Sequence, residues 1–157
     1  MDPADRSHAF PGESHGEILD RDACMALLSA AVIGRVAWPH PDGRVEVIPV
    51  NFVVDGDDLV FRTARGDKLT AVERGVPVSF EVDDVEPALR VGWSVLLSGH
   101  AEIVDDAEQV RRLEALLGAP WVAMTEPVFV RLRPGTISGR RLPLHPGGVS
   151  VQTGGDG

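Results

Sequence analysis

The stretch "VIPVNFVVDGDDLVFRTARGDKL", residues 47–69, decides the fold. It holds two runs rich in valine and phenylalanine on either side of "DGDD" at 55–58, which is the pattern of two antiparallel strands joined by a tight turn. The second run meets a glycine at 66, after which "KLTAVERG" predicts a short helix closed by Gly75. We therefore expect a strand, a hairpin turn, a second strand and a helix in close succession.

Further strands are predicted on both sides of this stretch. Upstream, "VIGRVAW" at 32–38 is followed by a turn whose Asp-Gly pair at 42–43 predicts a hairpin into the strand at 45–55. Gly99 lies inside a long apolar run and marks a bulge or bend. Strands joined by tight turns indicate a closed or half-closed antiparallel barrel with helices on its rim. The downstream strands are expected at 76–83, 93–106 and 127–134.

Two longer helices are predicted. In "LDRDACMALLSAA" at 19–31, Asp20 is the expected N-cap, and apolar residues recur at helical spacing from Cys24 onward. Cys24 is therefore interpreted as a buried structural thiol rather than a nucleophile. The second helix lies within residues 106–118, between an aspartate cap and a glycine stop.

The strand at 45–55 is apolar on both faces. A single-layer barrel strand with one solvated face would alternate between apolar and polar residues, so something must cover its outer face. Either a helix or another subunit does so, and because few helices are available we predict a homodimer that packs sheet against sheet. The apolar residues on one side are Val45, Val47 and Val53, and those on the other are Ile48, Val50, Phe52 and Val54.

Length and composition exclude several classes of protein. The 157 residues suit one domain, and the excess of 24 acidic over 15 basic residues argues against nucleic-acid binding. A single cysteine excludes an intrachain disulfide, and no segment reaches the roughly 18 continuous apolar residues of a membrane span. We expect a soluble, cytoplasmic protein with a folded domain at 17–142 and disordered tails at 1–16 and 143–157, which are rich in glycine, proline and small polar residues.

Stand-alone catalytic motifs are missing from the sequence. It has no G-x-S-x-G elbow, no H-E-x-x-H pair and no Walker A loop, and its five histidines are scattered, so no metal site is expected. His100 is the one histidine predicted on a strand, and we interpret it as structural rather than catalytic.

The basic turn at 62–68 is the remaining candidate for chemistry. Arg62, Thr63, Arg65 and Lys68 gather where a strand ends and a helix begins. Backbone N–H groups at the helix start and the neighbouring cations could hold an anion there. The alternative is a solvated turn whose cations only keep the edge soluble, and the turn alone leaves both readings open.

Five pieces of the chain, in this order, resemble the pyridoxamine 5'-phosphate oxidase-like, flavin-binding split-barrel family, particularly its short bacterial members of the nitroimidazole-resistance type. The resemblance implies a mainly β fold, a six-stranded antiparallel split barrel with flanking short helices. It also implies a homodimer with FMN in each of two clefts at the subunit interface. The pieces are "IGRVAW", "VIPVNFVVDGDDLVFRTARGDKL", "VSFEVDD", "GWSVLLSGHAEIVDD" and "FVRLRPGTISGRRL".

The same resemblance implies a set of cofactor-binding residues. In such proteins the basic turn holds the phosphate, the strand before it lines the flavin ring, the start of the long strand meets the ring's edge, and a basic residue near the C-terminus completes the site. These parts fall, in that order, on Arg62, Thr63 and Lys68; on Pro49, Val50 and Asn51; on Trp93, Ser94 and Val95; and on Arg140 or Arg141.

Strand alternation ranks these residues. Arg62 and Thr63 point to opposite faces of a regular strand, so both reach one phosphate only if the strand bends. We therefore favour Thr63 and Lys68 over Arg62. For Trp93, packing in the core or at an interface is favoured over direct contact with the ring.

The predicted function is an FMN-dependent oxidoreductase that acts on a small molecule through the flavin, with the protein supplying position and electrostatics. The arginine and histidine cluster at the C-terminus of the true oxidases is not recognisable, so oxidation of vitamin B6 is not expected. One alternative is a reductase that uses the deazaflavin F420. Another is a non-catalytic flavin or haem carrier or sensor on the same barrel.

Overall fold

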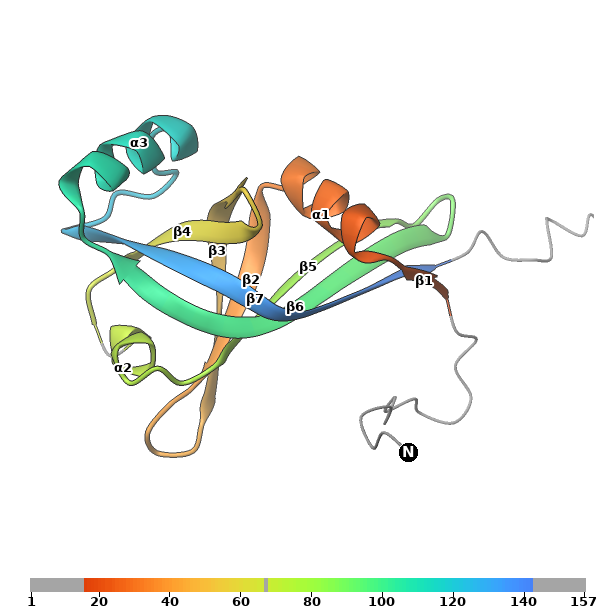
Figure 1. The fold of residues 1–157 in the computed structure, drawn as a ribbon. Helices are drawn as coiled ribbons and strands as arrows, with labels where there is room; N and C mark the ends of the chain where they lie inside the picture. Colours follow the sequence, from red (N-terminus) through yellow and green to blue (C-terminus); the bar gives the residue numbers. More distant parts are fainter. Residues whose placement is uncertain (1–15, 67, 143–157) are drawn as a thin grey trace, which may run out of the picture.

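A computed structural model describes residues 16–66 and 68–142, and the backbone but not the side chain of Lys68. The predicted tails fall outside these residues, Gly16 excepted. Seven strands and three helices follow one another along the described chain (Figure 1). In order they are β1 (Glu17–Leu19), α1 (Arg21–Ala30), β2 (Ile33–Pro39), β3 (Val45–Asp55), β4 (Asp58–Ala64), α2 (Lys68–Glu73), β5 (Val78–Glu86), β6 (Val91–Val104), α3 (Ala107–Leu117) and β7 (Pro127–Leu142).

The strands form one antiparallel sheet that closes on itself. Its order is β1-β7-β4-β3-β2-β5-β6, and β6 also pairs with β7, which closes β2 to β7 into a six-stranded barrel. The short β1 is an added strand that pairs with the C-terminal end of β7. The predicted mainly β, six-stranded antiparallel barrel with short flanking helices is therefore confirmed.

The helix caps and the bulge predicted from the sequence are present in the structure. The side chain of Asp20 accepts a hydrogen bond from the backbone N–H of Ala23 at 2.8 Å, which caps α1. Asp106 caps α3 in the same way. The β6–β7 register shifts between Ser98 and Gly99, where a side chain would collide with the carbonyl of Arg133. The predicted bulge at Gly99 is thus present, and close backbone approach explains the glycine.

The barrel interior is a continuous apolar core. Phe80 is fully buried at its centre, with the rings of Phe52 and Phe61 at centroid distances of 5.0 and 6.1 Å. Cys24 on α1 is also fully buried, as predicted, and burial raises the pKa of its thiol. Aromatic pairs at these distances add to the stabilisation from burial alone.

The outer face of β3 is only partly covered. Near Val53, α3 packs Leu113 onto Val60 and Phe129 to form a second, smaller cluster. Farther along the strand, Val45 and Val47 are 67% and 58% exposed. One helix therefore covers one end of the two-faced strand, and no other described element covers its other end.

The β5–β6 hairpin extends well beyond the barrel. β2 pairs with β5 only as far as Glu81, whereas the β5–β6 pairing continues to Glu86 and Val91. We call this extension, together with the end of β7 and β1, the arm; it projects to the right in Figure 1. β7 continues to Leu142 instead of ending near residue 134 as predicted, because it pairs along nearly the whole of β6.

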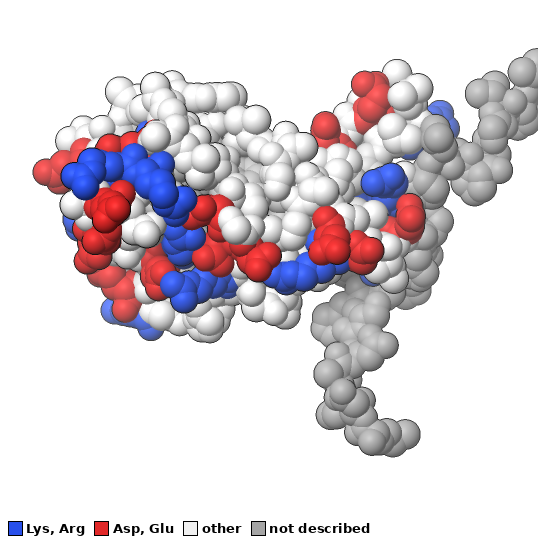
Figure 2. All heavy atoms as spheres, turned by 45° about the horizontal axis from the view of Figure 1, so that its top comes forward, with Lys and Arg blue, Asp and Glu red and all other residues white. Residues whose placement is uncertain are grey.

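Charge is mixed on the face of the molecule that Figure 2 draws. Figure 2 shows acidic and basic side chains lying next to one another over the end of the molecule that carries α3. None of the helices in the described ranges is long and apolar enough to cross a membrane.

Candidate functional site

Arg62 is a nearly buried cation without a carboxylate partner among the residues that the structure describes. It lies on β4 with only 9% of its surface exposed, and its guanidinium carbon is 5.8 Å from the centroid of the Phe129 ring. No ion pair to Arg62 occurs within the part of the chain that the structure describes. A buried guanidinium normally has an anionic partner, because its desolvation is costly.

Asn51 supplies a second donor beside Arg62 that has no partner in the described part of the chain. The two residues flank the Phe52–Phe61 pair on adjacent antiparallel strands, and their side chains alternate to the outer face of the barrel. The side-chain nitrogen of Asn51 is buried and has no hydrogen-bond partner among the described residues. Two donors without an acceptor at one place fit an anionic ligand.

Thr63 lies on the other face of β4. It lines a small interior cavity of about 10 Å³ together with Phe61 and Leu69, and its hydroxyl donates a 3.4 Å hydrogen bond to the carbonyl of Ala64. The predicted opposition of Arg62 and Thr63 across the strand is therefore present. The side chain of Lys68 lies outside the described atoms, so the ranking of Thr63 and Lys68 above Arg62 stays a prediction.

The other residues predicted to line the ring also lie on opposite faces of their strands. Val50 is 9% exposed and belongs to the core, whereas Pro49 is exposed on the same outer face as Asn51. On β6, Val95 is fully buried in the core. The side chains of Val50 and Val95 therefore face the barrel interior, and Pro49 and Asn51 face outward.

The arm carries the remaining predicted residues on two faces. Trp93 is opposite Arg141, whereas Ser94 is opposite Arg140, so the two arginines point to opposite sides. The Trp93 face continues the inner face of the barrel, since Val95 two residues on is in the core. Trp93 is partly buried and packs against that core, in agreement with the favoured packing role.

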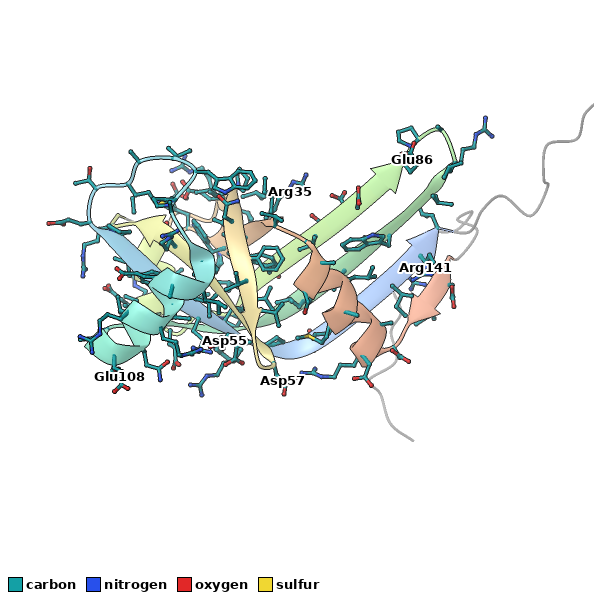
Figure 3. All side chains as sticks on the ribbon, turned by 90° about the horizontal axis from the view of Figure 1, so that it is seen from above. Arg35, Asp55, Asp57, Glu86, Glu108 and Arg141 are labelled. Carbon is teal, nitrogen blue, oxygen red and sulfur yellow. The ribbon has the colours of Figure 1, made fainter. Side chains whose placement is uncertain are left out.

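A cavity of about 540 Å³ lies on the inner face of the arm. Arg141 and Trp93 line it together with three carboxylates, those of Glu17, Asp84 and Glu86. Figure 3 labels Glu86 and Arg141 on this arm, away from Asp55 near α3. Sequence reasoning missed these carboxylates, because they come from two strands, β1 and β5, that are far apart in the sequence and meet only through cross-strand pairing with β6 and β7.

The structure brings the predicted residues together as two sets, not one. Asn51 and Arg62 lie side by side on the barrel, and Trp93 and Arg141 lie side by side on the arm. Arg62 on β4 pairs with Phe129 on β7. Arg141 lies twelve residues beyond Phe129 on β7, which corresponds to about 40 Å measured along the strand. One described chain therefore offers two separate halves of the predicted site.

An ion-pair network beyond the predicted site fixes α3. Asp55 accepts hydrogen bonds from Arg112 on α3 at 2.6 Å and from Arg131 on β7 at 2.8 Å. Arg131 also reaches Asp58 at 3.2 Å. The two guanidinium groups, Arg112 foremost, hold the pKa of Asp55 well below its usual range. The two carboxylates and the two guanidinium groups pair with one another, so we interpret the network as a structural clamp of α3 rather than a ligand site.

The described residues hold no group of three or more histidine, cysteine, aspartate or glutamate side chains placed to bind a metal ion. The closed six-stranded antiparallel barrel with short flanking helices defines the class of the fold, a split-barrel protein. Residues 20–141 match the family described as pyridoxamine 5'-phosphate oxidase, and the chain belongs to that family.

Comparison with known proteins agrees with this assignment. The chain is 37% identical to the uncharacterized protein Rv0080 of Mycobacterium tuberculosis over 129 residues, which cover 79% of this chain and 84% of the relative. It is also similar to the solved FAD binding protein of Mycobacterium smegmatis, at 33% identity and a TM-score of 0.67, over 80% of this chain and 98% of the other.

A more distant structure shares the fold. A protein of Bacteroides thetaiotaomicron named for 5-nitroimidazole antibiotic resistance aligns at 14% identity and a TM-score of 0.65, over 85% of this chain and 95% of the other. The predicted family is confirmed by the match over residues 20–141, and the likeness to this nitroimidazole-resistance protein is one of fold.

Proposed function

We propose that this chain is an oxidoreductase that binds a flavin nucleotide, FMN or the FMN half of FAD, between two copies of itself. The proposal rests on two neighbouring donors on the outer face of the barrel that have no acceptor among the described residues, the guanidinium of Arg62 and the amide of Asn51. A flavin phosphate is an acceptor of the right charge for both. The flavin supplies hydride or electron transfer when it is bound.

The second copy completes the site in this proposal. Within one chain the arm lies far from Arg62, so Trp93 and Arg141 reach a flavin held at Arg62 only if they come from a partner. The exposed apolar residues Val45 and Val47 on the outer face of β3 give that partner a surface to pack against. The chain's own residues then bind the phosphate, exclude water from the outer face and orient the ring between the two copies.

The experiment is a titration of FMN and FAD into the purified protein and an Arg62→Gln variant. Removing a charged hydrogen bond to phosphate costs about 1.5 to 3 kcal/mol, or roughly 10- to 100-fold in affinity. Arg133→Gln is the matched control, since it removes an exposed cation from β7 that pairs with Glu102 instead. Equal affinities for Arg62→Gln and wild type would contradict the proposed phosphate site.

The rival anchor is tested in the same assay. If Thr63 and Lys68 hold the phosphate, Lys68→Ala combined with Thr63→Ala removes the flavin and Arg62→Gln does not. We expect the opposite pattern. The mass of the cofactor released on denaturation identifies FMN, FAD or F420. Reduction of the bound flavin by NADH or NADPH, followed by turnover with quinones or nitroaromatics, separates an enzyme from a carrier.

A further inference from the structure

The loop between α3 and β7, residues 118–126, exposes an apolar surface that the proposed phosphate site leaves unused. Trp121 and Val122 are 69% and 70% exposed, and Met124 is 37% exposed. Single exposed apolar residues are common on proteins, but three large ones within four positions are a surface that gains from being covered. We call this segment the α3–β7 loop.

Both ends of the α3–β7 loop are fixed beside Arg62. At its start, Leu117 packs on the cluster that contains Phe129, whose ring lies under the Arg62 guanidinium. At its end, Pro127 pairs with Ala64, two residues from Arg62 on β4. Figure 1 shows the loop running from the end of α3 to the start of β7, next to β4. Its nine residues are therefore tethered at the edge of the proposed phosphate site.

The backbone at the two ends of this loop adopts a left-handed conformation. Gly118 has a φ of +67° and Glu126 a φ of +50°, both in the left-handed region. That region is natural for glycine but unfavourable for a residue with a Cβ, and such residues persist where the surrounding structure holds them. The strand pairing of Pro127 directly after Glu126 is such a restraint, and it fixes the direction in which the loop leaves β7.

We propose that Trp121 is a flavin-binding residue, which lays its indole on the isoalloxazine ring of the flavin whose phosphate is held by Arg62 and Asn51. This inference rests on the proposed function and adds to it the residue that covers the ring. A planar heterocycle and an indole stack favourably, and the contact removes apolar surface of both from water. The exposed side chains of Val122 and Met124 on the same loop would add to the apolar cover.

The test uses flavin fluorescence, because an indole in contact with isoalloxazine quenches its emission by electron transfer. FMN and FAD are titrated into the wild type, Trp121→Phe and Trp121→Ala. Trp121→Phe keeps the stack, so its affinity stays within a few-fold of wild type while the emission of the bound flavin rises several-fold. Trp121→Ala loses the stack and binds roughly 10-fold more weakly. Trp38→Phe is the control, since that indole is in the barrel core, and its bound flavin stays dark.

Four results of these titrations would contradict the inference about Trp121. If bound flavin stays equally dark in Trp121→Phe, the inference is wrong. It is also wrong if Trp93→Phe alone restores emission, because the arm then stacks on the ring. A loss confined to FAD affinity would place the indole on adenine and overturn the assignment to isoalloxazine. If the wild type binds neither flavin, the proposed function fails, and this inference fails with it.

Discussion

Arg62 shows how one residue can change the interpretation of a site. In the sequence it is one of several cations around a turn, and strand alternation ranks it below Thr63. In the structure it is nine-tenths buried on the outer face, over Phe129 and beside the unpaired amide of Asn51. Burial of a cation without a partner within 16–66 and 68–142 is a tertiary property, so spacing along the chain could not reveal it.

Asp55 gives the residue-scale prediction for stability. Its carboxylate joins Arg112 and Arg131, and Asp55→Asn leaves the nearly buried Arg131 with Asp58 as its one remaining partner. We expect the free energy of unfolding at pH 7 to fall by about 2 kcal/mol, less than for a fully buried pair because Arg112 is half exposed. Urea unfolding of both proteins measures the difference.

The stability difference between the wild type and Asp55→Asn should depend on pH. Because the folded-state pKa of Asp55 is depressed below its ordinary value of 3.8, its stabilising contribution is present above that value and is lost as the pH falls. The stability difference between wild type and Asp55→Asn should therefore shrink progressively below about pH 5. A difference that stays constant from pH 7 to pH 3 would contradict the assigned cause of the pKa shift.

At the scale of elements, Leu113 is the one fully buried side chain of α3. Leu113 is fully buried between Val60 and Phe129, whereas Leu116 on the same helix is 48% exposed. Leu113→Ala should lower the free energy of unfolding by about 3 kcal/mol through lost burial and a cavity. Leu116→Ala should change it by less than about 0.5 kcal/mol. Equal effects in thermal or urea unfolding would show that α3 does not pack as described.

Local elements were predictable from the sequence, and long-range ones were not. The caps at Asp20 and Asp106 and the bulge at Gly99 depend on a few neighbouring residues, so they were predicted in place. The short β1 and the extension of β7 to Leu142 exist because distant strands pair with them. The arm and its carboxylates depend on that pairing, and spacing alone could not place Arg141 and Trp93 on one face.

The whole-molecule prediction concerns the exposed end of β3. Val47 is 58% exposed at the end of the outer face that α3 does not cover, and in the proposed homodimer it is buried against the second copy. Val47→Lys places an unpaired charge in that contact and should convert the dimer to monomer, as measured by light scattering during gel filtration. Asp57→Lys, at the exposed β3–β4 turn labelled in Figure 3, is the control and should leave the mass unchanged.

An unchanged dimer mass for Val47→Lys would move the interface elsewhere. A monomer that keeps full flavin affinity would contradict the proposal that two copies form the site. A monomer with weakened binding is the expected result, because Arg62 and the arm reach one flavin only from different chains.

The most direct test of the central claim is the absorbance spectrum of the purified protein after incubation with excess flavin and removal of the unbound fraction. If the donors on Arg62 and Asn51 hold a flavin phosphate, the protein retains flavin absorbance at about one flavin per chain, and Arg62→Gln retains far less. A colourless wild-type protein after loading with either FMN or FAD would contradict the account.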